Sequence, residues 1–143
     1  MRASTLTKCV CVSAFWLAIG SAAHAAGPCT NASLTGTYGF QEQGEFPGGG
    51  FTQFRSVGVI TFDGRGAGRR TSTIWYSDFS VADGITNPIA YDVHPNCTFN
   101  YTYLDNLETY SAVIIDGGQK LLWLEISGDP MRSGQAERIK SAP

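Results

Sequence analysis

Two glutamates are the side chains of this sequence whose spacing best suits chemistry. Glu42 follows Phe40 by two residues and Glu125 follows Trp123 by two, so each shares one face of an extended strand with an aromatic ring. If either face points into an apolar interior, burial raises the pKa of the carboxyl group toward that of a general acid or base. The alternative, which we favour for both, is that Glu42 lies at an exposed rim and Glu125 faces water.

No motif in the sequence predicts a nucleophilic triad, a metal centre or a phosphate loop. His94 is the only histidine after residue 25, and it adjoins Pro95 in a predicted turn. There is no cluster of cysteines and histidines with the spacing of metal ligands. We therefore expect no metal and no cofactor.

Other polar residues gather where tight turns are expected. Asp63, Asp83 and Asp116 each precede a glycine, and Asp-Gly supplies the positive φ that tight turns require. We interpret all three aspartates as turn residues. Arg69 and Arg70 cluster with Arg65 near one predicted hairpin; they are interpreted as a solvated base of that loop in preference to an anion site.

The first 25 residues have the pattern of a secretory signal peptide. Arg2 and Lys8 precede an uncharged apolar run over 9–20, and Ala23-His24-Ala25 resembles a cleavage site. The run is too short to span a bilayer. A lipoprotein signal acylated at Cys29 is the weaker alternative, because Gly-Pro before it is a poor lipobox. We expect an exported protein, periplasmic or secreted.

Composition restricts the domain that remains. The full chain has 17 glycines and 15% charged residues, which disfavours a helical bundle and a charged disordered chain. Residues 26–143 carry 8 basic and 12 acidic residues, a formal charge of −4. Such a surface repels phosphate backbones and anionic lipids, so we expect neither nucleic-acid binding nor stable membrane insertion.

Two cysteines remain after the predicted signal peptide. Cys29 and Cys97 are isolated in the sequence, and an exported compartment favours their oxidation. A functional thiol pair is the alternative, although neither cysteine belongs to a C-x-x-C motif. We therefore predict a disulfide that ties the start of the domain to its middle.

Short segments of alternating polarity predict strands along the chain from residue 34. Nothing after residue 25 has the 3.6-residue period of an amphipathic helix. The segments with a period of two are 34–40, 51–62, 69–79, 89–93, 97–103, 109–115, 120–127 and, more weakly, 131–140. Joined by short turns, they predict an all-β antiparallel meander.

We expect the meander to close into a small up-and-down barrel of seven or eight strands, forming one domain over 26–143. Closure removes exposed strand edges. A β-sandwich is the alternative. Each strand should turn its most apolar face inward. The residues expected to line the interior, and to contact any ligand there, are Tyr38, Phe40, Trp75, Tyr76, Tyr91 and Tyr101.

Three stretches, 34–40, 57–66 and 91–98, resemble a loose group of small exported bacterial proteins of unassigned function. They read L-T-G-T-Y-G-F, V-G-V-I-T-F-D-G-R-G and Y-D-V-H-P-N-C-T. Gly36-Thr37-Tyr38 is also similar to the G-x-W start of lipocalins, with Tyr in place of Trp and without a T-D-Y element. Arg138 is similar to the late lipocalin arginine that packs near the first strand. The resemblance implies a calycin-like barrel.

The leading functional hypothesis is a binding protein that holds a small apolar or aromatic ligand. It depends on the many aromatic and hydroxyl side chains on the predicted inner faces. One alternative is a cofactor-free cyclase or isomerase, which would resemble allene-oxide-cyclase-like barrels and use Glu42 or Glu125. The other is an exported protein that acts through its surface.

Overall fold

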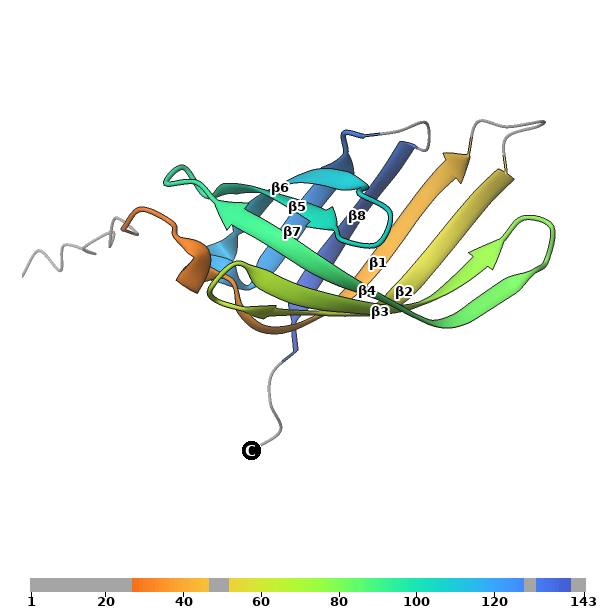
Figure 1. Cartoon of the computed structure of the whole chain (residues 1–143), viewed down its shortest axis with the longest axis horizontal. Coiled ribbons are helices and arrows are strands. Elements are labelled where there is room, and N and C mark those ends of the chain that lie inside the picture. The colour runs from red at the N-terminus through yellow and green to blue at the C-terminus, as the bar shows by residue number, and fades with distance from the viewer. Residues whose placement is uncertain (1–26, 47–51, 128–130, 140–143) are drawn as a thin grey trace, which may run out of the picture.

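The computed structural model describes residues 27–46, 52–127 and 131–139, which form one closed barrel (Figure 1). Its strands are β1 (Thr35–Phe46), β2 (Thr52–Asp63), β3 (Ala67–Tyr76), β4 (Val81–Val93), β5 (Thr98–Tyr103), β6 (Thr109–Ile115), β7 (Lys120–Glu125) and β8 (Met131–Arg138). Within the described ranges, the helices are two short 3-10 turns, η1 (Asn31–Ser33) and η2 (Asp116–Gly118). The predicted signal peptide lies outside these ranges.

Every strand pairs antiparallel with the next one along the chain, and β1 also pairs with β8. Tyr38 on β1 lies opposite both Ile60 on β2 and Arg138 on β8, so the first and last strands close the barrel. The predicted up-and-down barrel is confirmed, and the sandwich alternative is wrong. The weakly predicted last strand is also confirmed.

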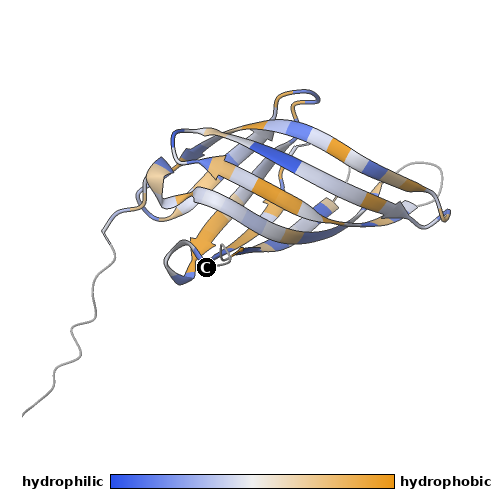
Figure 2. Cartoon of the chain, turned by 90° about the horizontal axis from the view of Figure 1, so that it is seen from below, coloured by the Kyte–Doolittle hydropathy of each residue, from blue (hydrophilic) through white to orange (hydrophobic). Residues whose placement is uncertain are grey.

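The barrel interior is filled mainly by aromatic and aliphatic side chains. Inward and outward residues alternate along the strands, as the bands of hydropathy along the ribbons illustrate (Figure 2). The predicted inner face of β1, which carries Tyr38 and Phe40, is buried, and so is that of β4 with Ile89, Tyr91 and Val93. Eight strands leave an interior that side chains can largely fill.

The predicted turn at Asp63 is confirmed and closes the hairpin between β2 and β3. Its carboxylate oxygen Oδ1 accepts hydrogen bonds from the backbone N–H groups of Arg65, Gly66 and Ala67 at 2.7, 3.1 and 3.0 Å. These bonds lower the pKa of Asp63. The turn at Asp116 is confirmed as well, since this residue begins η2.

The predicted turn at Asp83 is wrong, because residues 82–84 lie inside β4 and the chain reverses at 77–80 instead. Gly84 has φ +67°, and the pairing of β3 with β4 shifts register between Ser72 and Ile74. Asp83 accepts a hydrogen bond from the Thr73 hydroxyl beside this irregularity. A bulge requires the same positive φ as a turn, so the Asp-Gly pattern alone could not separate them.

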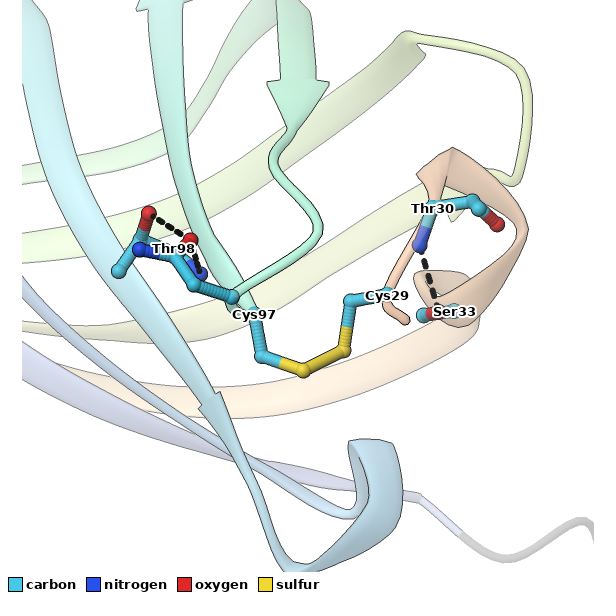
Figure 3. Close-up of a disulfide and its surroundings, with 6 residues drawn as sticks. Cys29, Thr30, Ser33, Cys97 and Thr98 are labelled. Atoms are coloured by element: carbon cyan, nitrogen blue, oxygen red, sulfur yellow. Dashed lines mark hydrogen bonds between the residues drawn. A yellow bond between two sulfur atoms is a disulfide. The ribbon is translucent and has the colours of Figure 1, made fainter. Parts of the chain in front are cut away.

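The two ends of the barrel are built differently, and we call one of them the disulfide end. The disulfide joins Cys29 to Cys97 with their Cα atoms 4.9 Å apart, as predicted (Figure 3). The Cys29 N–H donates to the Pro95 carbonyl at 3.2 Å. The Asn31 side chain accepts from the Val93 N–H at 2.8 Å. The segment before β1 is therefore held against the turn after β4.

Tyrosine hydroxyls complete the hydrogen bonds of this end. The Tyr38 hydroxyl donates to the Gly118 carbonyl at 2.8 Å and accepts from Arg138 Nη2 at 2.7 Å. The Arg138 guanidinium lies over the Tyr38 ring, 5.1 Å from its centroid, so this arginine does pack on the first strand. The Tyr91 hydroxyl donates to the Leu34 carbonyl at 3.2 Å. Buried phenols thus find the partners they need.

Candidate functional site

A buried arginine lies inside the barrel toward the opposite end, which we call the open end. Arg70, on β3, is 4% exposed. Its Nη2 donates to Glu42 Oε2 at 2.5 Å and to Ser56 Oγ at 3.1 Å, and its Nη1 donates to the Tyr103 hydroxyl. The ion pair joins β3 to β1, two strands away. Arg70 therefore spans the interior.

Aromatic side chains surround this arginine–glutamate pair. The guanidinium carbon of Arg70 is 4.4 Å from the Phe40 ring centroid. The indole Nε1 of Trp123 donates to Glu42 Oε1 at 3.4 Å. Burial opposes the charge on Arg70, but the Tyr103 and Glu42 oxygens outweigh it and raise its pKa. Arg70 consequently stays charged in a low-dielectric interior.

A second arginine joins three strands and a loop at the open end; we call Glu108, Tyr110, Glu125 and Arg132 the rim cluster. Arg132 forms a bidentate pair with Glu108, at 2.7 Å from Nη1 to Oε2 and 2.9 Å from Nη2 to Oε1. Its Nη1 also donates to the Tyr110 hydroxyl at 3.1 Å. Bidentate pairs of this kind fix orientation as well as charge.

Glu125 is the most unusual carboxylate of the rim cluster. Its side chain is 1% exposed, and Oε2 lies 3.2 Å from Arg132 Nε. Neither carboxylate oxygen has a hydrogen bond within the described residues, so the contact with Arg132 is an ion pair without hydrogen-bond geometry. Burial raises the pKa of Glu125 to about 7, with Arg132 opposing the shift and Glu108 adding to it.

A cavity of about 180 Å³ opens between the arginine–glutamate pair and the rim cluster. We call it the mouth cavity. It is lined by Glu42, Phe46, Phe54, Arg70, Ser72, Ile74, Tyr76, Ile85, Asn87, Tyr103, Asn106, Glu108 and Arg132. Six of these thirteen residues are aromatic or aliphatic and seven are polar or charged. Small-molecule sites likewise combine apolar walls with convergent polar groups, although this lining is more polar than most.

Several polar atoms around the mouth cavity lack a partner among the described residues. The Ser72 hydroxyl, Arg70 Nε and Arg132 Nε are buried without a hydrogen bond. Each such group costs about 1–3 kcal/mol when its hydrogen bond is missing. Residues of the lining therefore hold buried polar groups with unused hydrogen-bonding capacity within the described part of the chain.

Two larger depressions, of about 650 and 810 Å³, lie along β1, β2 and β8. Their walls include exposed outward-facing side chains, among them Gln41, Gln43 and Ser133. No residue with a buried unpartnered atom lines either depression within the described residues. We therefore consider the smaller mouth cavity, whose lining includes buried unpartnered atoms of the described residues, the better candidate.

Five of the six predicted ligand-binding residues point into the barrel, where they lie in three environments. Tyr38, Tyr91 and Tyr101 lie in the packed core, and Phe40 lies under the Arg70 guanidinium. Tyr76 lines the mouth cavity.

Trp75 does not line the interior, because it lies on the outer face of β3 and is 40% exposed. Tyr76, the next residue along the chain, takes the inward direction. Adjacent residues of a strand point to opposite faces, so only one of these two predicted residues could line the interior.

The expected exposure of both glutamates is wrong. Glu42 and Glu125 are buried, whereas the opposite face of β7, with Leu122 and Leu124, is exposed together with Ile126. Arg70 and Arg132 account for the reversal, because each supplies a buried glutamate with a cation. The hydrophobicity of a single strand could not reveal partners from other strands.

Arg70 was also wrongly interpreted as a solvated loop residue, and Arg132 and Glu108 were missed. Arg70 shares the inner face of β3 with Ser72 and Tyr76. That period-two spacing was the available signal for its direction. The sequence carried no comparable signal for the pairing of Glu108 with Arg132, which joins a loop to a distant strand.

No family profile, curated protein or solved structure matches the chain. Fold and site together define a class: a closed antiparallel barrel with a hydrogen-bonded aromatic core at one end and, at the other, a small cavity between one buried and one partly buried ion pair. Among the described residues, no helix is long and apolar enough to cross a bilayer. In the same residues, His, Cys, Asp and Glu side chains form no group of three suited to a metal ion.

Proposed function

We propose that this protein is an exported barrel that binds a small ring-shaped apolar or aromatic molecule in the mouth cavity. The observation that carries the proposal is the combination of volume and lining. An apolar cavity of about 150 Å³ accommodates benzene. The mouth cavity, at about 180 Å³, has room for one ring with a small substituent.

The buried ion pair supports a functional interpretation of this end. Burying a salt bridge contributes little net stability, because desolvation offsets the attraction of the charges. Stability alone therefore does not explain why Arg70 and Glu42 replace apolar residues in the barrel. A fixed polar floor beneath a cavity gives a bound ring a defined orientation.

Export to the periplasm or to the medium is part of the proposal. The disulfide between Cys29 and Cys97 is consistent with an oxidising compartment. The apolar run and cleavage pattern of the first 25 residues point the same way.

Catalysis is the second candidate, and the raised pKa of Glu125 favours it. A carboxyl group with a pKa of about 7 suits proton transfer near neutrality. However, Glu125 does not line the mouth cavity, and Arg132 lies between the two. We therefore rank binding above a cyclase or isomerase activity.

The test is a titration with three single-ring probes: ethylbenzene, acetophenone and benzoate. Isothermal calorimetry should show saturable binding of at least one probe to the wild-type protein. Ile74→Trp, which fills the cavity from its wall, should abolish that binding. Val57→Trp adds the same side chain to the outer face, where Val57 is exposed, and should preserve it.

Failure of all three probes to bind the folded wild-type protein would overturn the proposal and favour action through the outer surface. Native mass spectrometry of protein purified from its own export route adds an independent measurement. A co-purifying small molecule that Ile74→Trp loses and Val57→Trp keeps would support the mouth cavity.

A further inference from the structure

The charges lining the mouth cavity are balanced. Arg70 is paired with Glu42 at 2.5 Å, and Arg132 is paired with Glu108 at 2.7 Å. Neither arginine offers an uncompensated positive charge to a ligand. A carboxylate or phosphate entering the cavity would add an unpaired negative charge to a buried site, which is costly.

Binding of a cationic ligand is also unfavourable, for a different reason. Three of the four aromatic rings that line the cavity already contact arginines. Arg132 lies 5.0 Å from the ring centroid of Phe46 and 5.3 Å from that of Phe54, and Arg70 lies 5.5 Å from that of Tyr103. A second cation beside them would be repelled. The walls therefore favour a neutral ligand.

Among the described residues, two buried groups of the lining that lack a hydrogen bond can donate one. Arg70 Nε can only donate, and the Ser72 hydroxyl can donate or accept. Both belong to side chains that line the cavity, whereas Arg132 Nε already faces Glu125 Oε2 at 3.2 Å. A ligand oxygen that accepts hydrogen bonds would complement them.

From these three observations we infer that the ligand is a neutral single-ring compound carrying a carbonyl oxygen. This inference rests on the proposed binding function and names the chemical class of its ligand. The ring occupies the apolar walls, and the carbonyl oxygen accepts a hydrogen bond from the Ser72 hydroxyl. The paired arginines exclude carboxylates of the same size.

The three probes separate this inference from the binding proposal itself. Acetophenone is neutral and has a carbonyl group, ethylbenzene has nearly the same shape without the oxygen, and benzoate is anionic. One hydrogen bond between neutral groups contributes roughly 1 kcal/mol, so acetophenone should bind about threefold to tenfold more tightly than ethylbenzene. Benzoate should bind most weakly.

Equal binding of ethylbenzene and acetophenone would overturn the inference while leaving the binding function intact. Tightest binding of benzoate would overturn it as well, because the cavity would then act as an anion site. Absence of binding by every probe would instead remove the binding function on which the inference rests.

Ser72→Ala tests the assigned donor directly. Its hydroxyl has no partner among the described residues, so the variant should fold as well as the wild type. Acetophenone affinity should fall about threefold to tenfold, whereas ethylbenzene affinity should stay unchanged. Ser111→Ala, on the outer face of β6, is the matched control and should alter neither affinity. Unchanged acetophenone binding in Ser72→Ala would contradict the assignment.

Discussion

The two ends of this barrel solve the problem of buried polar groups in opposite ways. At the disulfide end, the hydroxyl groups of Tyr38 and Tyr91 each donate to a backbone carbonyl. At the open end, Arg70 and Arg132 pair with carboxylates, and several buried polar atoms have no hydrogen bond within the described residues.

The loops at the two ends also differ in polarity. The disulfide end is closed by polar and glycine-rich turns around Asp63 and Asp116. The open end exposes large apolar side chains, with Phe79 84%, Leu107 69% and Met131 72% exposed. Within the described residues, this chain therefore concentrates its covalent and hydrogen-bonded restraints at one end and its buried unpartnered polar atoms at the other.

The largest expected effect comes from breaking the ion pair at the open end. Arg70→Leu leaves the Glu42 carboxylate buried without a cation, which should lower the free energy of unfolding by about 3–5 kcal/mol. Urea denaturation measures the change. Glu42→Leu combined with Arg70→Leu should recover most of the loss, because both charges are then absent. A double variant as unstable as the single one would show that the pair is a structural necessity.

Breaking the disulfide should have a smaller effect, confined to stability. Cys29→Ser with Cys97→Ser should lower the free energy of unfolding by about 2–4 kcal/mol, because the unfolded chain gains freedom. Probe affinity should stay unchanged, since the bond lies at the end remote from the mouth cavity. Two reactive thiols per chain in unfolded, unreduced wild-type protein would contradict the bond itself.

The smallest effect expected is a pH dependence arising from the rim cluster. The folded-state pKa of Glu125, about 7, lies above the ordinary value of 4.5, so the folded protein binds this proton more tightly than the unfolded chain. Protonation of Glu125 makes its full contribution to the free energy of unfolding below pH 4.5, and that contribution is lost as the pH rises through about 7. Asp63 at the disulfide end has a lowered pKa and contributes with the opposite sign, at more acidic pH.

Urea midpoints measured from about pH 4.5 to just above pH 7 test this contribution. Glu125→Gln should flatten the dependence over that interval, whereas Glu137→Gln, an exposed glutamate of β8, should leave it unchanged. A wild-type midpoint that rises with pH through this interval would contradict the sign.

Local patterns in the sequence were enough to predict the strands and the disulfide. Alternation located each strand, and the isolation of Cys29 and Cys97 left few other fates for them. The direction of β7 was a different problem, because both of its faces are apolar. Leu121 and Trp123 lie on one face and Leu122 and Leu124 on the other, so hydrophobicity could not choose between them.

The candidate site was only partly predictable, for a related reason. Glu42 was recognised as a possible interior carboxylate, but its partner Arg70 follows it by 28 residues and lies two strands away. Only the register of β1, β2 and β3 brings the two together. The mouth cavity likewise depends on how six strands and the loop between β5 and β6 meet, which no single segment of the sequence encodes.

The pairing of β1 with β8 also sets the order in which this chain can be completed. The Ile139 N–H donates to the Thr37 carbonyl at 2.9 Å, so the last described residue is bonded to the first strand. When the chain emerges from its N-terminus, Cys97 appears well before β8. The disulfide can therefore form while β1 and β7 are still unpaired edge strands. Unpaired edges invite association between chains. Formation of the disulfide can thus tether the incomplete sheet before β8 pairs with β1, while its unpaired edges are open to aggregation.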